Sequence, residues 1–352
     1  MKIIRIVIKT TILLILCNAI YAIIQPNFAT LSIYNHIIPG RERLPYGENP
    51  QLSYNISSNN LPTLFESHII SRPKATDEFR VLLIGDSSTW GWFLTADETL
   101  AAQINTNDYH TPDGRRIVAY NLGYPIMSLT KDLLILDYAM RYEPDLVIWL
   151  ITLESLSPSN QTSPPIIQYN PTHMIDLIER YNLNLPLPKQ PNIMDHTIII
   201  QRRELANWLR LQTYGFAWAA TRIDQYIPDL IPPQPLNFNE TTDWEGFTVD
   251  SPFEAADLSL DLFNRLELGI PLLIVNEPMF ISDDPQHYNI FYPRWAYDHY
   301  RQLLSAQGWT NYIDLSDSIP PQFFTDSPVH LNAQGITMLR DILMSELLQR
   351  LD

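Results

Sequence analysis

Residues 80–91 read RVLLIGDSSTWG, and this stretch decides the fold that the sequence predicts. The apolar run 81–84 is rich in branched residues, as is typical of a strand buried on both faces of a sheet. Gly85 ends the run, and Asp86 and Ser87 follow at the carboxyl end of the strand. A serine at a tight turn from strand to helix can act as a nucleophile, because nearby backbone N–H groups can face a developing oxyanion. The alternative is an ordinary βα loop in which a serine caps the following helix.

Apolar runs and amphipathic segments alternate along much of the remaining chain. Besides the run at 81–84, strands are predicted at 116–121, 146–151, 270–275 and 311–315. Helices are predicted at 97–105, 129–142, 253–267 and 332–351. Strands that alternate with helices predict an α/β fold with a doubly wound, mostly parallel five-stranded sheet of the flavodoxin-like kind.

Two long proline-rich segments interrupt this pattern. Residues 25–76 show no sustained periodicity and are interpreted as a stalk or a wrapping arm that leads to a domain at 77–352. The connection between the third and fourth strands is far longer than a usual crossover, and its middle part, about 157–252, is interpreted as a cap over the active edge of the sheet. An aromatic, helical stretch at 201–225 lies within this insertion and is expected to serve packing.

Residues 1–24 predict a membrane anchor. Lys2, Arg5 and Lys9 come first, an uncharged apolar run follows, and the segment is close to the ~20 residues that cross a bilayer. Because basic flanks stay on the cytoplasmic side, we expect the rest of the chain on the extracytoplasmic side of the membrane. The alternative is a cleaved signal peptide, whose removal would give a secreted protein.

The composition argues against several classes of function. Acidic residues number 39 and basic residues 23, and the resulting net charge of −16 argues against nucleic acid as a partner, because phosphate binding needs a basic surface. The single cysteine, Cys17, allows no disulfide within the chain. The histidines show no ligand spacing, so the sequence predicts neither a metal site nor a cofactor.

Notable residues follow the predicted strands at their carboxyl ends, the edge at which open parallel sheets bind ligands. They are Asp86 and Ser87 after the first strand, Gly123 after the second, Glu154 after the third, Asn276 and Glu277 after the fourth, and Asp326 and His330 beyond the fifth. A serine after the first strand and an Asp–His pair after the last predict a nucleophile and a general base at one edge. The other carboxyl and amide side chains are candidates for the substrate site, although Glu277 could instead pair with an arginine such as Arg294.

These blocks resemble the SGNH, or GDSL, hydrolase superfamily over about residues 79–351, apart from the insertion. The first block is Gly85-Asp86-Ser87, the second centres on Gly123, and the last runs from Asp326 to His330. The resemblance implies Ser87 as nucleophile, His330 as general base and Asp326 as the acid that orients it. It also implies that backbone N–H groups of Ser87 and Gly123 form the oxyanion hole.

The acid of the predicted triad departs from the family spacing. The family places an aspartate three residues before the histidine, whereas here Ser327 holds that position and Asp326 lies one residue further away. Asp314 and Asp317 are alternatives, as is a Ser–His dyad without an acid.

The third block departs as well. The family supplies an asparagine side chain to the oxyanion hole, and by strand register Glu154 stands at that place. A carboxylate repels an oxyanion unless burial keeps it protonated. Glu154 therefore either titrates within the site or points away from it, and Asn276 or a residue of the cap is the alternative donor.

The sequence leads to three hypotheses of function. The first is a serine-dependent esterase outside the cytoplasm that removes acyl groups from a carbohydrate or a lipid. The second follows from a likeness to anchored SGNH proteins that modify exported polysaccharides: an O-acyltransferase, with a multi-pass membrane acyltransferase as its partner. The third is a binding module that kept the fold and lost turnover.

Overall fold

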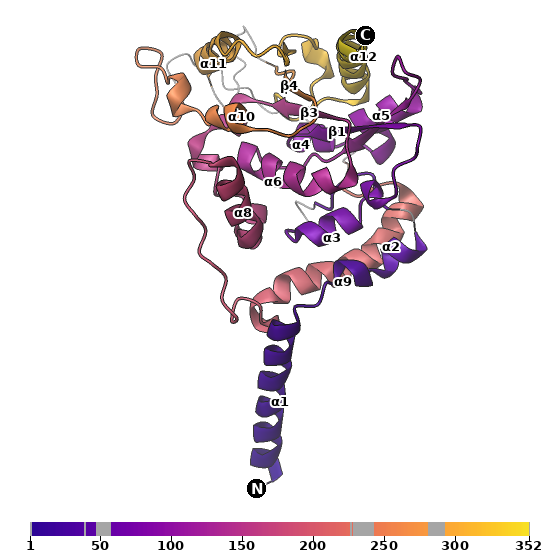
Figure 1. Ribbon diagram of the computed structural model, residues 1–352, viewed down its shortest axis with the longest axis vertical. Helices are drawn as coiled ribbons and strands as arrows, with labels where there is room; N and C mark the ends of the chain where they lie inside the picture. The colour runs from indigo at the N-terminus through magenta and orange to yellow at the C-terminus, as the bar shows by residue number, and fades with distance from the viewer. Residues whose placement is uncertain are drawn as a thin grey trace.

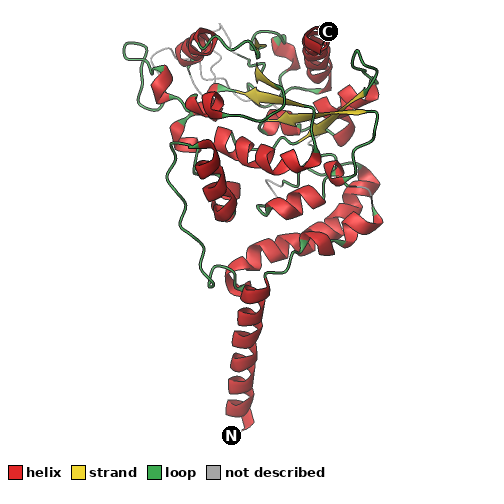
Figure 2. Cartoon of the chain, viewed as in Figure 1, coloured by secondary structure: helices red, strands yellow, loops and turns green. Residues whose placement is uncertain are grey.

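A parallel five-stranded sheet lies at the centre of the fold (Figure 1 and Figure 2). The protein is described here by a computed structural model, which covers residues 2–38, 40–46, 58–225, 227, 243–280 and 293–351. The strands are β1 (Glu78–Ile84), β2 (Arg116–Asn121), β3 (Leu146–Ile151), β4 (Leu272–Asn276) and β5 (Tyr312–Asp314), in the order β2-β1-β3-β4-β5. All neighbouring pairs are parallel, so the predicted doubly wound α/β fold is confirmed.

Helices cover both faces of this sheet, which is why its strands read as continuous apolar runs. Within β1, Leu82 and Ile84 face one hydrophobic cluster, and Val81 and Leu83 face the other. The first cluster includes residues of α3 (Leu61–Glu66), α6 (Leu129–Ala139), α8 (Pro171–Tyr181), α10 (Asp261–Arg265) and α11 (Arg294–Ala306). The second includes residues of α5 (Leu100–Thr106) and α12 (Ala333–Leu351). In Figure 1, α6 lies below the sheet and α12 above it.

Two of the predicted helices are shorter than expected. The segment predicted at 97–105 is a 3-10 turn, Ala96–Glu98, followed by α5, because Thr99 is extended and its hydroxyl caps the Ala102 N–H at 3.3 Å. The segment predicted as a helix at 253–267 is broken before α10. Leu258 is extended there, and the Ser259 N–H donates to the Leu156 carbonyl at 3.0 Å, which ties the chain to the start of the insertion.

The proline-rich segment 25–76 lies against the domain. It contains α2 (Ile33–Ile37) and α3, and the α3 residues Leu64 and Phe65 are fully buried. His68 follows α3 and is also fully buried, with its Nε2 atom 3.0 Å from the Asn121 carbonyl at the end of β2. The described part of this segment, here called the arm, therefore packs on the domain.

Most of the described insertion does not lie over the active edge of the sheet, where a cap was expected. Its helices are α7 (Pro165–Tyr169), α8 and α9 (Ile198–Thr221), and α8 packs against α6. The long helix α9 packs against α1 (Lys2–Ile24) and α2 and runs across the base of the domain (Figure 1). It is held there by polar contacts with the arm, such as the bond from the Asn59 N–H to the Glu204 carboxylate at 3.0 Å. Part of the expected cap, 228–242, lies outside the described residues.

The N-terminal segment forms a single helix that projects from the domain (Figure 1). α1 contains 23 residues and is therefore about 34 Å long, compared with about 30 Å for the hydrocarbon core of a bilayer. Its mean hydropathy is 2.1 in the most apolar window, and little of that window is buried against the protein. By length and composition, α1 is compatible with a membrane anchor or with a signal sequence.

Candidate active site

A tight turn after β1 presents Ser87. Asp86 follows the strand and caps the short helix α4 (Ser87–Trp90), because its Oδ1 atom accepts a hydrogen bond from the Ser88 N–H at 2.8 Å. Gly85 must be a glycine, because a Cβ atom there would lie 2.2 Å from the Thr89 hydroxyl. Ser87 is thus the first residue of α4, where a helix leaves its N–H without an intrahelical acceptor.

His330 and Asp326 meet Ser87 from the other end of the chain. The His330 Nε2 atom lies 2.8 Å from Ser87 Oγ, and its Nδ1 atom lies 2.8 Å from Asp326 Oδ1. Both side chains are mostly buried, with 10% and 20% of their surfaces exposed. When the Nδ1–H group donates a hydrogen bond to the Asp326 carboxylate, Nε2 is left as an acceptor for the serine hydroxyl proton. The three residues therefore have the contacts of a nucleophile, a general base and an orienting acid.

The loop before α12 explains how an aspartate four residues away reaches the histidine. The Thr325 N–H donates to the His330 carbonyl at 2.8 Å and closes the loop between the two triad residues. Ser327, which holds the family's usual acid position, accepts a bond from the His330 N–H at 3.3 Å and so supports the backbone. The alternative acids, Asp314 and Asp317, both pair with Arg301, at 3.0 and 2.7 Å.

Sequence reasoning did not single out Trp92, which lies beside the histidine. Its ring stacks on the His330 ring with 5.9 Å between centroids and 25° between planes. Such a contact limits the rotation of the imidazole and shields one face of it from water. The sequence shows an aromatic residue two positions after the helix that begins with Ser87. It does not indicate which ring this residue contacts.

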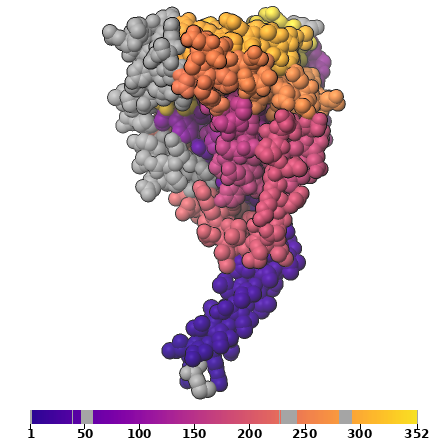
Figure 3. All heavy atoms as spheres, turned by 90° about the vertical axis from the view of Figure 1, so that its left-hand side faces the viewer, coloured from indigo at the N-terminus to yellow at the C-terminus, as the bar shows by residue number. Residues whose placement is uncertain are grey.

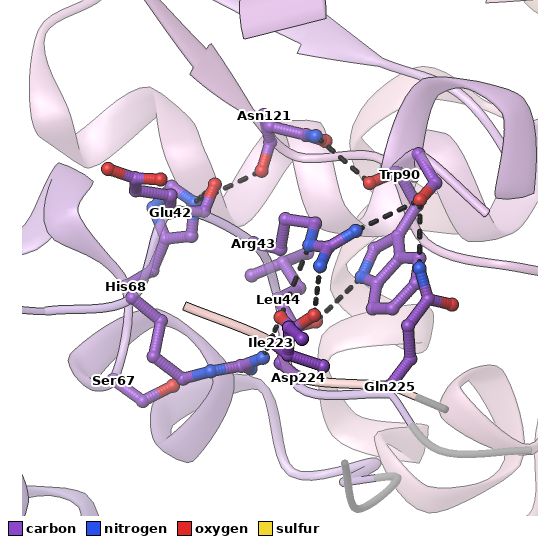
Figure 4. A network of polar contacts seen from close by, with 12 residues as sticks. Glu42, Arg43, Leu44, Ser67, His68, Trp90, Asn121, Ile223, Asp224 and Gln225 are labelled. Carbon is purple, nitrogen blue, oxygen red and sulfur yellow. Dashed lines mark hydrogen bonds and ion pairs between the residues drawn. The ribbon is translucent and has the colours of Figure 1, made fainter. Parts of the chain in front are cut away.

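A buried network behind the site holds the loop that carries Trp92 (Figure 4). Arg43 of the arm donates to the carbonyls of Gly91 and Leu94, at 2.9 and 3.0 Å. Gln225, after α9, donates to the same two carbonyls at 3.1 and 3.0 Å. Arg43 also pairs with Asp224, which in turn pairs with Arg41. The arm and the end of the insertion thus position the loop next to His330.

Gly123 does not have the free N–H that the resemblance implied. Its N–H donates to the Asn121 Oδ1 atom at 3.0 Å. A Cβ atom on Gly123 would lie 2.4 Å from the Trp90 nitrogen, so this glycine allows the loop after β2 to pack against α4.

Three residues further on, Ile126 has a φ of +94°, which is rare for a β-branched residue. Backbone strain of this kind clusters at functional sites, and the sequence carried no sign of it.

The hydrogen bonds of Glu154 and Asn276 go to residues other than Ser87, His330 and Asp326. The Glu154 carboxylate accepts bonds from Asn160 Nδ2 at 3.0 Å and from Trp244 Nε1 at 3.4 Å, so it faces the insertion. Burial raises the pKa of Glu154 above its usual value. The Asn276 amide donates to Asp314 at 2.9 Å and accepts from the Tyr300 hydroxyl at 2.9 Å. Both side chains therefore have structural partners in this arrangement.

Glu277 lies behind the serine turn. Its carboxylate accepts a hydrogen bond from the Ser88 hydroxyl, whereas Arg294, the partner considered from the sequence, pairs with Asp298. Burial, and then the nearby charge of Asp86, raise the pKa of Glu277 well above its usual value. Glu277 therefore contacts α4 from behind and can hold the helix that begins with Ser87.

Lys131 joins this turn to the next loop. Its ammonium group donates to the carbonyls of Gly85 and Tyr124, both at 2.8 Å, and pairs with Asp132. Burial raises the pKa of Asp132 to about 6.

Within the described ranges, no three or more His, Cys, Asp or Glu side chains are grouped so that they could hold a metal ion.

Comparisons with known proteins were made by sequence and by structure. No protein-family model and no curated protein sequence matches the chain. Among solved structures, the chain is similar to Est24, a carbohydrate acetylesterase from Sinorhizobium meliloti, at 13% identity over 76% of this chain and 97% of that one, with a TM-score of 0.32. It is also similar to a lipase/acylhydrolase from Enterococcus faecalis, at 12% identity over 77% and 96% of the chains, with a TM-score of 0.27. The observed α/β sheet, with Ser87 after β1 and the Asp326–His330 pair before α12, has the order of blocks of the SGNH, or GDSL, hydrolase superfamily that the sequence resembles.

Proposed function

We propose that this protein is a serine-dependent acyl-ester hydrolase of the SGNH type. The observation that carries the proposal is the chain of contacts from Ser87 Oγ to His330 Nε2 and from His330 Nδ1 to Asp326, each at 2.8 Å. A hydroxyl held by a base that is itself oriented by an acid is the arrangement that nucleophilic acyl transfer needs.

The proposed reaction follows from these contacts. His330 takes the proton of Ser87 as its oxygen attacks the ester carbonyl, and Asp326 stabilises the imidazolium that forms. The Ser87 N–H, at the start of α4, faces the developing oxyanion. His330 then protonates the leaving alcohol, and water, activated by the same imidazole, releases the acid from the acyl-serine.

The proposal includes a location and a substrate class. The basic start of the chain and the apolar helix α1 support an anchor whose domain lies outside the cytoplasm. An anchored esterase at that place meets acylated carbohydrates and lipids of the cell surface, and these are the proposed substrates.

The test uses the full chain in detergent micelles with p-nitrophenyl acetate and a serine-directed phosphonate. We expect Ser87→Ala and His330→Ala each to lower turnover by up to ~10⁶-fold, and Asp326→Ala by roughly 10⁴-fold. The double variant Ser87→Ala/His330→Ala should be no worse than either single one, because the residues act as a unit. Ser345→Ala, on an exposed position of α12, is the matched control and should keep full activity.

Phosphonate labelling that persists in Ser87→Ala would overturn the assignment of the nucleophile. Labelling of Ser87 without hydrolysis would instead favour an O-acyltransferase that waits for its multi-pass membrane partner. A folded protein with neither labelling nor turnover would be a binding module.

A further inference from the structure

We propose that α9 lies in the interfacial layer of the membrane that α1 crosses, and that its outward face binds an anionic lipid surface. This face, here called the α9 face, consists of Ile199, Arg202, Arg203, Leu209, Arg210 and Phe216. The proposal rests on the membrane anchoring proposed for α1 and is independent of the esterase chemistry.

The position of α9 relative to α1 is the first argument. The Ile199 N–H donates to the Asn18 Oδ1 atom at 3.2 Å, and Asn18 and Ala22 are the buried residues of α1. At ~1.5 Å of rise per residue, Asn18 lies about 9 Å along α1 from its end at Ile24. The start of α9 is therefore level with the last turns of α1, which is the depth at which interfacial helices lie.

The views of the whole molecule agree with this position. In Figure 1, α9 begins beside the upper end of α1 and rises obliquely from there across the base of the domain toward α2. In Figure 3, turned by a quarter, the same segment again forms the lower part of the domain where α1 leaves it. A membrane crossed by α1 therefore meets α9 before it meets the sheet.

The second argument is that large apolar side chains stay exposed on α9, although its other side is well buried. The side toward the protein carries apolar residues, Leu211 and Trp218, together with Glu204, Asn207 and Gln212, which are at most 9% exposed. Gln212 accepts a bond from the Ser32 hydroxyl at 3.0 Å, so this polar side chain is satisfied within the protein. Leu209 and Phe216, on the opposite side, are 60% and 39% exposed.

These exposed positions form one continuous stripe. At 3.6 residues per turn, positions 199, 202, 206, 209, 213, 216 and 220 fall on the same side of a helix. The neighbouring helix α2 adds exposed apolar residues, since Ile33 and Ile37 are 56% and 67% exposed. An apolar surface next to a membrane-crossing helix is best covered by the boundary between headgroups and acyl chains.

The charges on the α9 face are the third argument. The chain as a whole carries a net charge of −16, yet Arg202, Arg203 and Arg210 are all exposed on or beside this stripe. Arginines among apolar residues match an anionic headgroup layer, with their stems in the apolar zone and their guanidinium groups at the phosphates. Three such residues shift the equilibrium between the free and the lipid-bound α9 face toward the lipid-bound form by roughly 10²-fold on an anionic membrane.

The experiment places a fluorophore on the face of the full chain. Cys17→Ser removes the single cysteine, and Leu209→Cys or Phe216→Cys then takes an NBD label whose emission reports contact with lipid. The matched control is Ser345→Cys on α12, which lies on the far side of the sheet from α1 (Figure 1). Each protein is reconstituted in phosphatidylcholine vesicles with or without phosphatidylglycerol, and spin-labelled lipid with a shallow nitroxide serves as quencher.

We expect blue-shifted emission and quenching at positions 209 and 216, stronger with phosphatidylglycerol, and neither at position 345. Changing Arg202, Arg203 and Arg210 together to Gln should remove most of the dependence on phosphatidylglycerol, and changing them to Lys should keep it. The two triple variants change the same three positions to long, flexible side chains and differ there only in charge. A difference between them therefore reports the charge and not a loss of folding.

The outcomes separate the inference from the anchoring on which it rests. Protein that floats with the vesicles while the labels at 209 and 216 stay in water would overturn the interfacial position of α9 and leave the anchor standing. Protein that does not float with vesicles would overturn the anchor itself. If the labels at 209 and 216 are shielded from water to an extent that depends on protein concentration and not on the lipid, the α9 face binds a second copy of the chain. This result would refute the proposal.

Discussion

Asp224→Asn is expected to destabilise the protein strongly, because it removes the one carboxylate that two buried arginines share. Asp224 pairs with Arg41 and Arg43, whose side chains are 3% and 0% exposed. Burial lowers the pKa of Arg41, and the charge of Asp224 counteracts this. The neutral amide would leave two guanidinium groups close together in the protein interior without the carboxylate that pairs with both of them among the described residues.

The magnitude follows from the cost of an unpaired buried charge. Breaking a buried ion pair by removing one partner costs about 3–5 kcal/mol, which is a large share of the roughly 5–15 kcal/mol that stabilises a typical protein. With an m-value of about 3 kcal/mol per M urea, the unfolding midpoint should fall by roughly 1–1.7 M. Esterase activity should fall as well in native conditions, since Arg43 holds the Gly91 and Leu94 carbonyls of the loop beside His330.

The assay is urea unfolding of the full chain in detergent micelles, followed by tryptophan fluorescence. Asp341→Asn is the matched control, because Asp341 pairs with Arg340 but has 58% of its side chain exposed, and such surface pairs contribute less than about 1 kcal/mol. A double-mutant cycle with Arg41→Met should show a coupling energy, because the two residues are in direct contact. If the midpoint of Asp224→Asn shifts no further than that of Asp341→Asn, the arginines are not buried as described and the reasoning fails.

Two further predictions concern the site. Trp92→Ala should lower kcat by roughly 10- to 100-fold with little change in KM, because the imidazole of His330 loses the ring that limits its rotation, and Trp92→Phe should recover much of the loss in steady-state kinetics. For Glu277, burial raises the pKa in the folded protein above the usual value of 4.5, so the unfolded chain releases its proton first as the pH rises. Its contribution to the unfolding free energy should therefore fall above about pH 4.5, by at most ~1.4 kcal/mol per pH unit, and Glu277→Gln should remove this slope in urea titrations at several pH values. Equal slopes for the two proteins would contradict the burial of that carboxyl group.

The sequence alone was sufficient for the sheet. The strands predicted at 116–121 and 146–151 have the bounds of β2 and β3, and the others differ by a few residues at their ends. Strands buried on both faces read as nearly continuous apolar runs, so their signal is local and strong. The pairing of Ser87 with the segment before the last helix was also predictable, because the carboxyl ends of parallel strands share one edge.

The contacts of the polar side chains required the tertiary structure. Nothing local in the chain indicates that Asp314 pairs with Arg301, since these partners are set by how β5 and α11 pack. Glu154 likewise meets Trp244 of the insertion, so its direction depends on a segment far away in the sequence.

The place of α9 was decided by tertiary structure as well. Its aromatic, weakly patterned sequence predicts a helix, but a helix can turn any side toward its neighbours. Polar partners supplied by the arm, Asn59 and Ser32, allow Glu204 and Gln212 to be buried beside Leu211 and Trp218. Polar side chains of α9 that find hydrogen-bond partners are buried here, whereas Leu209 and Phe216 stay exposed. The hydrophobicity pattern of the sequence therefore does not predict which side of α9 is buried.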